Sequence, residues 1–406
     1  MRIHIAVLLL TTSVATAAQP DAITAYEEGC ERLDYSPDGA FLATVPHKRG
    51  VPKVWDTATG ELKCAGATKP TFYNSVAFSP DGKWFAAGKG SGVQMFDADT
   101  GKLRRVLTSS ADGSVVDMAI SSDGKQLAAV QKENNIVDVF NTDSGLRIIT
   151  LMLPMEKPEA GTGGRGSVIF SPDGSDLVVA CGGRGWPDYV GKESVIALFD
   201  TKTWKLRASF PASTHNVISL DISPDGELLA AACHQAKKVK IWEMPQRREV
   251  KDVAADDIAQ WIKDLNDDDF GVRASADRKL RRIGPAAKEQ LAKASESSSA
   301  EVAFRARRIL DAMDDRDMKP LHVIQGPDGF HSVNFSPAGG VLATGTHGSG
   351  AANCTLWRLG RTLKRFDLPN RQNTFVVQFR PDGKQLAQGT RDGEILLHDV
   401  EEIISE

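Results

Sequence analysis

One tetrapeptide recurs along the chain and limits the folds that it can adopt. Ser-Pro-Asp-Gly occurs at residues 36–39, 79–82, 171–174 and 223–226, and close variants occur at 121–124, 336–339 and 380–383. Neighbouring copies are 42 to 52 residues apart, except for one interval of 113 residues. Because proline sets φ at the start of a turn and Asp-Gly allows a tight reversal, each copy predicts a hairpin turn. Seven such copies indicate a repeat architecture.

The segments around each turn have the pattern of short strands. An alternating strand precedes the turn, as at 76–78, and a second strand follows it, as at 41–44. A third strand ends in an aromatic residue that an acid often follows, as in Trp55-Asp56, and turns such as Thr59-Gly60 lead to a fourth. Four short strands in every forty-odd residues are the unit of a propeller blade. The sequence therefore predicts an all-β, seven-bladed β-propeller.

These turns and strand ends resemble the WD40 repeat family over residues 21–406, with one interruption. The Gly-His pair that the family places before the first strand is largely absent. Its tryptophan is replaced at four positions, namely Phe96, Phe140, Phe199 and His398. The resemblance implies a protein-interaction scaffold, and the replacements predict that apolar packing takes over from the family's polar network in most blades.

The last predicted blade lacks a fourth strand after residues 395–400. We expect residues 22–26, just before the first blade, to supply it and close the ring, because closure removes two exposed edges. The propeller is therefore assigned to residues 18–249 and 319–406.

The long interval predicts a small α-helical insert at residues 250–318. Apolar residues such as Val272, Ala276 and Leu280 fall on one helical face, and Gly284-Pro285 ends one helix and begins the next. The stretch 265–284 resembles a HEAT repeat, which implies a helical surface that binds proteins. We expect about four helices on the outer rim of the fifth blade, on the face of the turns. The arginines, among them Arg281, Arg305 and Arg308, are predicted to form ion pairs with nearby acids on a solvated helix surface.

The first 17 residues have the pattern of a signal peptide. Arg2 and His4 form a basic end, residues 5–10 an apolar core, and Ala15-Thr16-Ala17 a cleavage site of small residues. The apolar run is much shorter than the roughly 20 residues of a membrane span. We expect a secreted or periplasmic protein with no membrane span after signal cleavage; an uncleaved anchor is the alternative.

Charge and motifs exclude several function classes. The 49 basic and 53 acidic residues give a net charge of −4, so nucleic acid is not an expected partner. No catalytic motif is found, so no catalytic residue and no cofactor are assigned. The GxGxxG match at 161–166 precedes a strand instead of following one, which favours an inter-blade loop. Cys181 and Cys233, at equivalent positions in adjacent blades, are interpreted as buried thiols, with a disulfide as the alternative.

Candidate binding residues gather in two places. His215, His234, His331 and His347 are expected on the face opposite the turns, where they could ligate zinc or copper if they converged, or could simply be solvated. A loop in the fourth blade has the composition of an interaction hot spot. The predicted partner-binding residues are Arg184, Trp186, Asp188, Tyr189, His215 and His331.

The sequence thus favours an exported scaffold that presents loop and helical docking surfaces to an unidentified protein partner. Two alternatives stay open. One is a metal-dependent or other enzyme that uses the histidines of the propeller face, and the other is a structural envelope component that self-associates.

Overall fold

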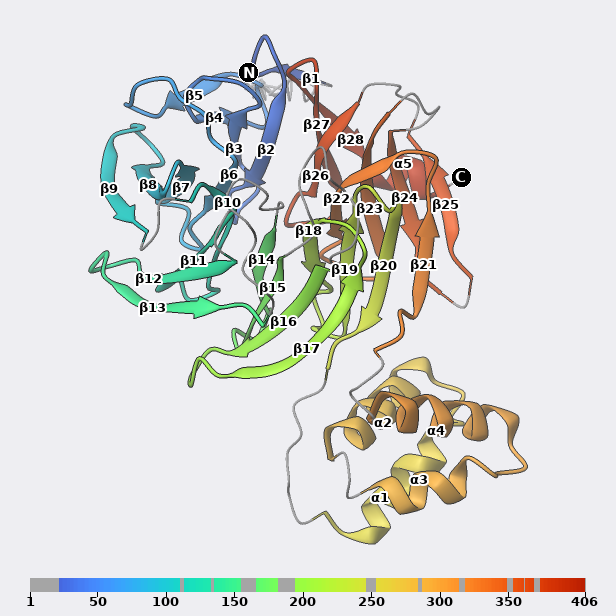
Figure 1. The fold of residues 1–406 in the computed structure, drawn as a ribbon. Coiled ribbons are helices and arrows are strands. Elements are labelled where there is room, and N and C mark those ends of the chain that lie inside the picture. Colours follow the sequence, from blue (N-terminus) through green and yellow to red (C-terminus); the bar gives the residue numbers. More distant parts are fainter. Residues whose placement is uncertain are drawn as a thin grey trace, which may run out of the picture.

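The computed structural model describes residues 22–109, 113–132, 135–154, 166–181, 194–245, 253–283, 287–313, 318–348, 353–360, 362–368 and 373–405. Within these ranges, seven antiparallel sheets of four strands each stand around a common axis (Figure 1). The seven-bladed β-propeller predicted from the repeated turns is therefore confirmed.

In blades one to six the strands pair in chain order from the axis outwards. Blades one to three consist of β2 (Cys30–Tyr35), β3 (Phe41–Pro46), β4 (Lys53–Asp56) and β5 (Leu62–Ala65); β6 (Ser75–Phe78), β7 (Trp84–Lys89), β8 (Gly92–Asp97) and β9 (Leu103–Thr108); and β10 (Val115–Ile120), β11 (Gln126–Gln131), β12 (Ile136–Asn141) and β13 (Arg147–Met152). Blades four to six consist of β14 (Ser167–Phe170), β15 (Asp176–Cys181), β16 (Ser194–Asp200) and β17 (Leu206–Ser213); β18 (Val217–Ile222), β19 (Leu228–Cys233), β20 (Lys238–Glu243) and β21 (His322–Gln325); and β22 (Gly329–Phe335), β23 (Val341–His347), β24 (Cys354–Arg358) and β25 (Lys364–Asp367).

Blade seven is built from both ends of the chain. Its inner strands are β26 (Thr374–Phe379), β27 (Gln385–Thr390) and β28 (Glu394–Asp399), and its outer strand is β1 (Ala22–Thr24). Ala22 lies opposite Leu396 in the antiparallel pairing of β1 with β28. Ile23 is buried in the apolar cluster between blades seven and one, so this strand contributes to the core as well as to the sheet.

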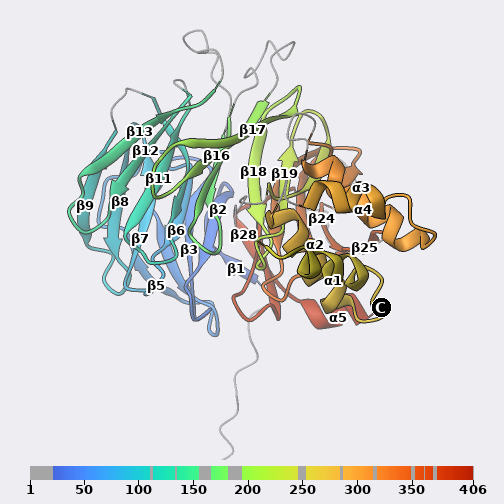
Figure 2. The same ribbon diagram turned by 90° about the horizontal axis from the view of Figure 1, so that it is seen from below.

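Four helices lie between β20 and β21, outside the ring (Figures 1 and 2). They are α1 (Ala255–Asp264), α2 (Phe270–Ile283), α3 (Lys288–Ala294) and α4 (Ala300–Met313). Their inward faces form a small core of their own, with Leu265, Leu280 and Ile309 buried. A fifth helix, α5 (Val400–Ser405), follows β28. Among the described residues, no helix is long and apolar enough to cross a membrane.

The repeated tetrapeptide forms the same turn in successive blades. In blade one, the Ser36 hydroxyl donates to Asp38 Oδ1 at 2.6 Å and accepts the backbone N–H of Phe41 at 2.9 Å. Gly39 has φ of +70°, a conformation that glycine adopts without steric cost. Ser79, Ser121, Ser171 and Ser223 make the same hydroxyl-to-carboxylate bond. The turn is therefore held by its side chains, which explains why its sequence recurs so closely.

Side chains of the inner strands join each blade to the next. The residue four positions before the turn serine accepts the backbone N–H of the following blade: Ser75 from Met118, Asp117 from Val168, Ser167 from Leu220, Ser219 from Val333 and Ser332 from Val377, at 3.0–3.2 Å. Two positions closer to the turn, Asp34 accepts from Phe78 at 2.6 Å and from the Gln378 amide at 2.5 Å. All seven blade interfaces are bridged in this way.

Candidate functional site

The inner strands present one register position at the end of the ring remote from the turns. This position lies five residues before the first residue of each turn. It is occupied by Glu31 in β2, Ile218 in β18, His331 in β22 and Phe375 in β26. The loops that follow the second strands reach the same end. Two separate parts of each blade thus contribute side chains to one face of the propeller.

Four imidazoles and the ring of Phe375 form one cluster of contacts on this face. His47 stacks on the Phe375 ring at a centroid distance of 4.6 Å. The ring centroid of His331 lies 4.3 Å from that of His234, 5.3 Å from that of His347 and 5.5 Å from that of Phe375. We call these four histidines and Phe375 the histidine cluster. Its members come from blades one, five, six and seven, so the cluster forms only in the closed ring.

Charged groups border the histidine cluster. His47 Nδ1 lies 2.6 Å from the carboxylate of Glu31, which is only 5% exposed. Arg391 Nη1 lies 3.5 Å from Nε2 of His347. Burial, followed by the positive charge of Arg391 and by His47, lowers the pKa of His347. At neutral pH His347 is therefore an uncharged, half-buried ring that can donate or accept a hydrogen bond.

Arg32 spans the centre of the ring beneath the histidine cluster. It projects from β2 in blade one, and its Nη2 donates to the carbonyl of Ile218 in blade five at 3.4 Å, while its Nη1 donates to the Glu31 carbonyl at 3.0 Å. Burial raises the pKa of Asp117 on the third inner strand, and the charge of Arg32 opposes that shift. The guanidinium thus places a positive charge near the axis of the ring, next to the face that carries the histidine cluster.

The comparisons with known proteins agree with this architecture. The family model "WD domain, G-beta repeat" matches residues 63–97 and 204–243, each match running from the outer strand of one blade to the third strand of the next. This chain contains WD40 repeats within a β-propeller.

Two curated proteins and one solved structure are similar to this chain. It is 23% identical over 43% of its length to an uncharacterized WD repeat-containing protein of Synechocystis sp., and 32% identical over 36% of its length to telomerase protein component 1 of Rattus norvegicus. It spans 47% of the first relative and 5% of the second. The β-propeller domain of Cps50 (Swd1) from Myceliophteria thermophila superimposes with a TM-score of 0.63 at 16% identity, covering 93% of this chain and 99% of that one.

The WD40 propeller brings three of the four predicted histidines together. His234, His331 and His347 belong to the histidine cluster, whereas Nδ1 of His215 contacts the Thr214 hydroxyl at 2.9 Å. Within the described part of the chain, no group of three or more His, Cys, Asp or Glu residues is arranged to hold a metal ion. The structure thus places three of these histidines in one cluster and His215 beside Thr214, and the zinc or copper hypothesis stays a prediction.

Other predicted residues fall outside the described ranges. These are Arg184, Trp186, Asp188 and Tyr189, residues 161–165 of the GxGxxG match, and residues 1–17. Cys233 is a free, buried thiol whose pKa is raised by burial, so the alternative disulfide with Cys181 is not formed.

Sequence reasoning missed Glu31, Arg32, His47 and Phe375. Glu31 and Phe375 share the register of His331, which had been singled out, so aligning the inner strands on their turns points to them. His47 occupies the same loop as His234 and His347, one blade interface away from Phe375. No sequence signal indicates that Arg32 reaches across the ring, because this contact joins two blades that are not neighbours.

Proposed function

We propose that this WD40 propeller is an exported protein-interaction scaffold that binds a protein partner on the face of the histidine cluster and presents the helical insert as a second docking surface. WD40 propellers typically serve as interaction scaffolds, which supports the general role. Fold alone does not define a function, so the assignment of a face must come from the residues on it.

The histidine cluster is the observation that favours this face. Three partly exposed imidazoles contact the buried Phe375 and a fourth, His234, packs on His331, while Glu31 and Arg391 lie at the border of the cluster. Imidazole rings offer apolar area together with hydrogen-bonding edges, and an aromatic residue such as Phe375 is of a type enriched at protein interfaces. The inter-blade bonds keep the supporting strands rigid, so a partner that binds here pays little entropy for ordering the surface.

A photo-cross-linking experiment distinguishes the two faces. Benzoyl-phenylalanine is introduced at His331 and, as the control, at the exposed Ser122 in a turn on the opposite face. We expect a covalent adduct with a partner protein in the native host from position 331 and none from position 122. Adducts from position 122 alone, or from neither position, would contradict the proposal.

Export is tested separately. The signal-peptide pattern of residues 1–17 predicts that the mature chain begins at Ala18. Intact-mass measurement of protein purified from the native host should give a chain without its first 17 residues, in the envelope or the medium. A full-length mass in the cytoplasmic fraction would refute export while leaving the scaffold proposal intact.

A further inference from the structure

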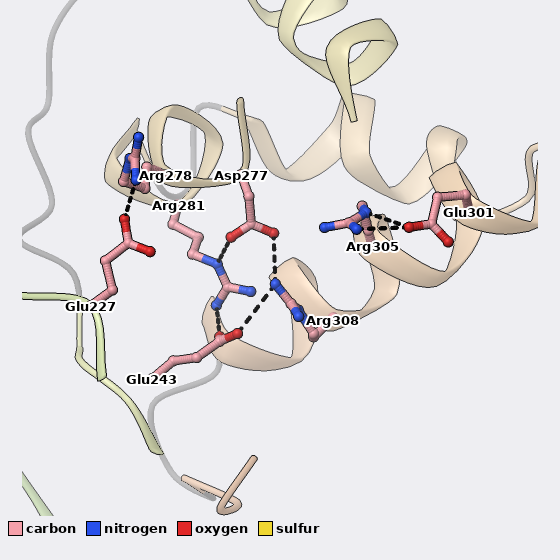
Figure 3. A network of polar contacts seen from close by, with 8 residues as sticks. All are labelled: Glu227, Glu243, Asp277, Arg278, Arg281, Glu301, Arg305 and Arg308. Atoms are coloured by element: carbon pink, nitrogen blue, oxygen red, sulfur yellow. Dashed lines mark hydrogen bonds and ion pairs between the residues drawn. The ribbon is translucent and has the colours of Figure 1, made fainter. Parts of the chain in front are cut away.

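An arginine–carboxylate network joins the helical insert to blade five (Figure 3). Arg281 in α2 donates to Glu243, the last residue of β20, at 2.5 Å, and Arg308 in α4 approaches the same carboxylate at 3.3 Å. Asp277 in α2 lies between them, 2.5 Å from Arg281 and 3.1 Å from Arg308.

A second ion pair lies beside this network, between Arg278 in α2 and Glu227. Glu227 directly follows the Ser-Pro-Asp-Gly turn of blade five, so the insert contacts the face of the turns. The prediction that these arginines pair with acids of the helical segment itself is therefore incomplete. Arg281 and Arg308 share Asp277 within the insert, but they also bind a glutamate of the propeller, and Arg281 is buried where a solvated surface was expected.

Within the described residues, no apolar cluster spans the four helices and the propeller. The core of the helices contains only their own residues and the adjoining Val253. Blade five completes its sheet with β21, without help from the helices. The helical insert therefore has its own apolar core and blade five has its own complete sheet, and the ion pairs connect the two. The pairs of Arg278 with Glu227 and of Arg308 with Glu243 are partly exposed, so they contribute little to stability and are screened by salt, which favours a reversible contact.

The charges balance only while the insert is docked. Arg278, Arg281 and Arg308 face two glutamates of blade five and one aspartate of their own helix. Without Glu227 and Glu243, three guanidiniums would be left beside Asp277. The Arg281 side chain is 8% exposed, yet its buried Nη2 has no hydrogen-bond partner among the described residues. The docked state therefore leaves one buried donor unused, which an anionic ligand with more acceptor oxygens could satisfy.

We propose that Arg278, Arg281 and Arg308 form a binding surface for an acidic peptide segment of a partner, and that Glu227 and Glu243 occupy this surface in the resting molecule. This inference rests on the proposed scaffold function and gives its helical docking surface a partner class. Closely spaced carboxylates on one peptide reproduce the contacts of the two glutamates and displace them. The insert then separates from blade five, so partner binding and opening are coupled.

The observations favour a peptide over a nucleic acid. The resting occupants are two carboxylates, and Asp277 at the centre of the surface would repel a regularly spaced phosphate backbone. The net charge of −4 adds long-range repulsion against a polyanion. A short segment with a few carboxylates fits the surface better, because its remaining residues can be neutral.

The test uses the full chain with Glu227→Gln and Glu243→Gln combined. The probe is a fluorescein-labelled peptide of alternating Glu and Gly residues, and its binding is followed by anisotropy. Because an occupied surface reduces apparent affinity by the fraction of open molecules, we expect the double variant to bind about tenfold more tightly than the parent. X-ray scattering should show a larger radius of gyration for the variant.

The matched control combines Glu289→Gln and Glu301→Gln. It changes the net charge equally, and the ion pairs of these glutamates with Lys293 and Arg305 lie within single helices. Its affinity and radius should match those of the parent. Adding Arg278→Gln and Arg308→Gln to the test variant should abolish the gain.

Three results would overturn the inference: no gain in affinity in the test variant, an equal gain in the control, or tighter binding of a short DNA duplex than of the peptide. None of these outcomes depends on the histidine face, so cross-linking at position 331 judges the scaffold proposal independently.

Discussion

Trp242 shows how a single residue departs from the repeat. Trp55 and Trp357 each donate their indole N–H to a threonine of the neighbouring strand, Thr44 and Thr344, at 3.0 Å. The equivalent position in blade five is Ala231. The Trp242 Nε1 is accordingly buried with no hydrogen-bond partner among the described residues. Leaving a buried donor unpaired costs about 1–3 kcal/mol.

Replacing Ala231 by Thr should restore this bond. The matched variant is Ala231→Val, because valine has nearly the same shape as threonine but no hydroxyl. We expect the Thr variant to be about 1 kcal/mol more stable than the Val variant in urea unfolding, whatever strain the added volume causes in both. Equal stabilities would show that the indole N–H is already satisfied, for instance by water.

At the level of the elements, the inner strands carry buried carboxylates at the blade interfaces. Burial raises the pKa of Asp221 to about 7 and that of Asp34 to about 6, although each accepts hydrogen bonds from the next blade or the previous one. Between pH 4 and 7 the folded chain therefore holds protons at these sites that the unfolded chain has released. Stability contributed by these groups is complete at low pH and falls as pH rises through this window.

Asp221→Asn should remove much of this dependence. The amide oxygen can still accept the bonds that Oδ2 receives from Phe335 N–H and the Asn334 amide. We expect the parent to lose about 2 kcal/mol more than the variant between pH 5 and 8, measured by urea unfolding. The exposed Asp392→Asn supplies the control for a change of one charge. Parallel pH profiles for the parent and Asp221→Asn would contradict this account.

The whole molecule depends on the pairing of β1 with β28. Ile23 is 2% exposed and packs among residues of blades seven and one. Ile23→Ala should therefore destabilise the entire ring by about 3 kcal/mol in a single cooperative transition, as seen by thermal unfolding. Phe72→Ala, at a residue that is 58% exposed, should leave the transition within about 0.5 kcal/mol of the parent. A local loss confined to β1 would disprove this role of the strand.

The repeat made much of the architecture predictable. The turn motif and the alternating strands sufficed for the blade count, because both are local properties of the chain. The replacement of Trp by Phe can also be explained from the sequence. Trp55 donates its indole N–H to Thr44, whereas blade two has Ala87 at the position of Thr44, so its aromatic residue, Phe96, needs no donor. Contacts between blades were not predictable in this way. Phe375 meets His47 only because the ring closes, and the position of Glu243 against Arg281 depends on how the helices return to the blade.

Closure by β1 also has a consequence for biosynthesis. The first described strand to be translated pairs with the last, so a chain that stops early has no β28 to receive it. Any truncated product keeps an open blade with exposed sheet edges and an unshielded Ile23. Quality-control proteases recognise such features, because they act on chains that fail to bury their apolar segments. Because β1 is buried only when β28 is present, a chain that contains both strands is the form that resists degradation.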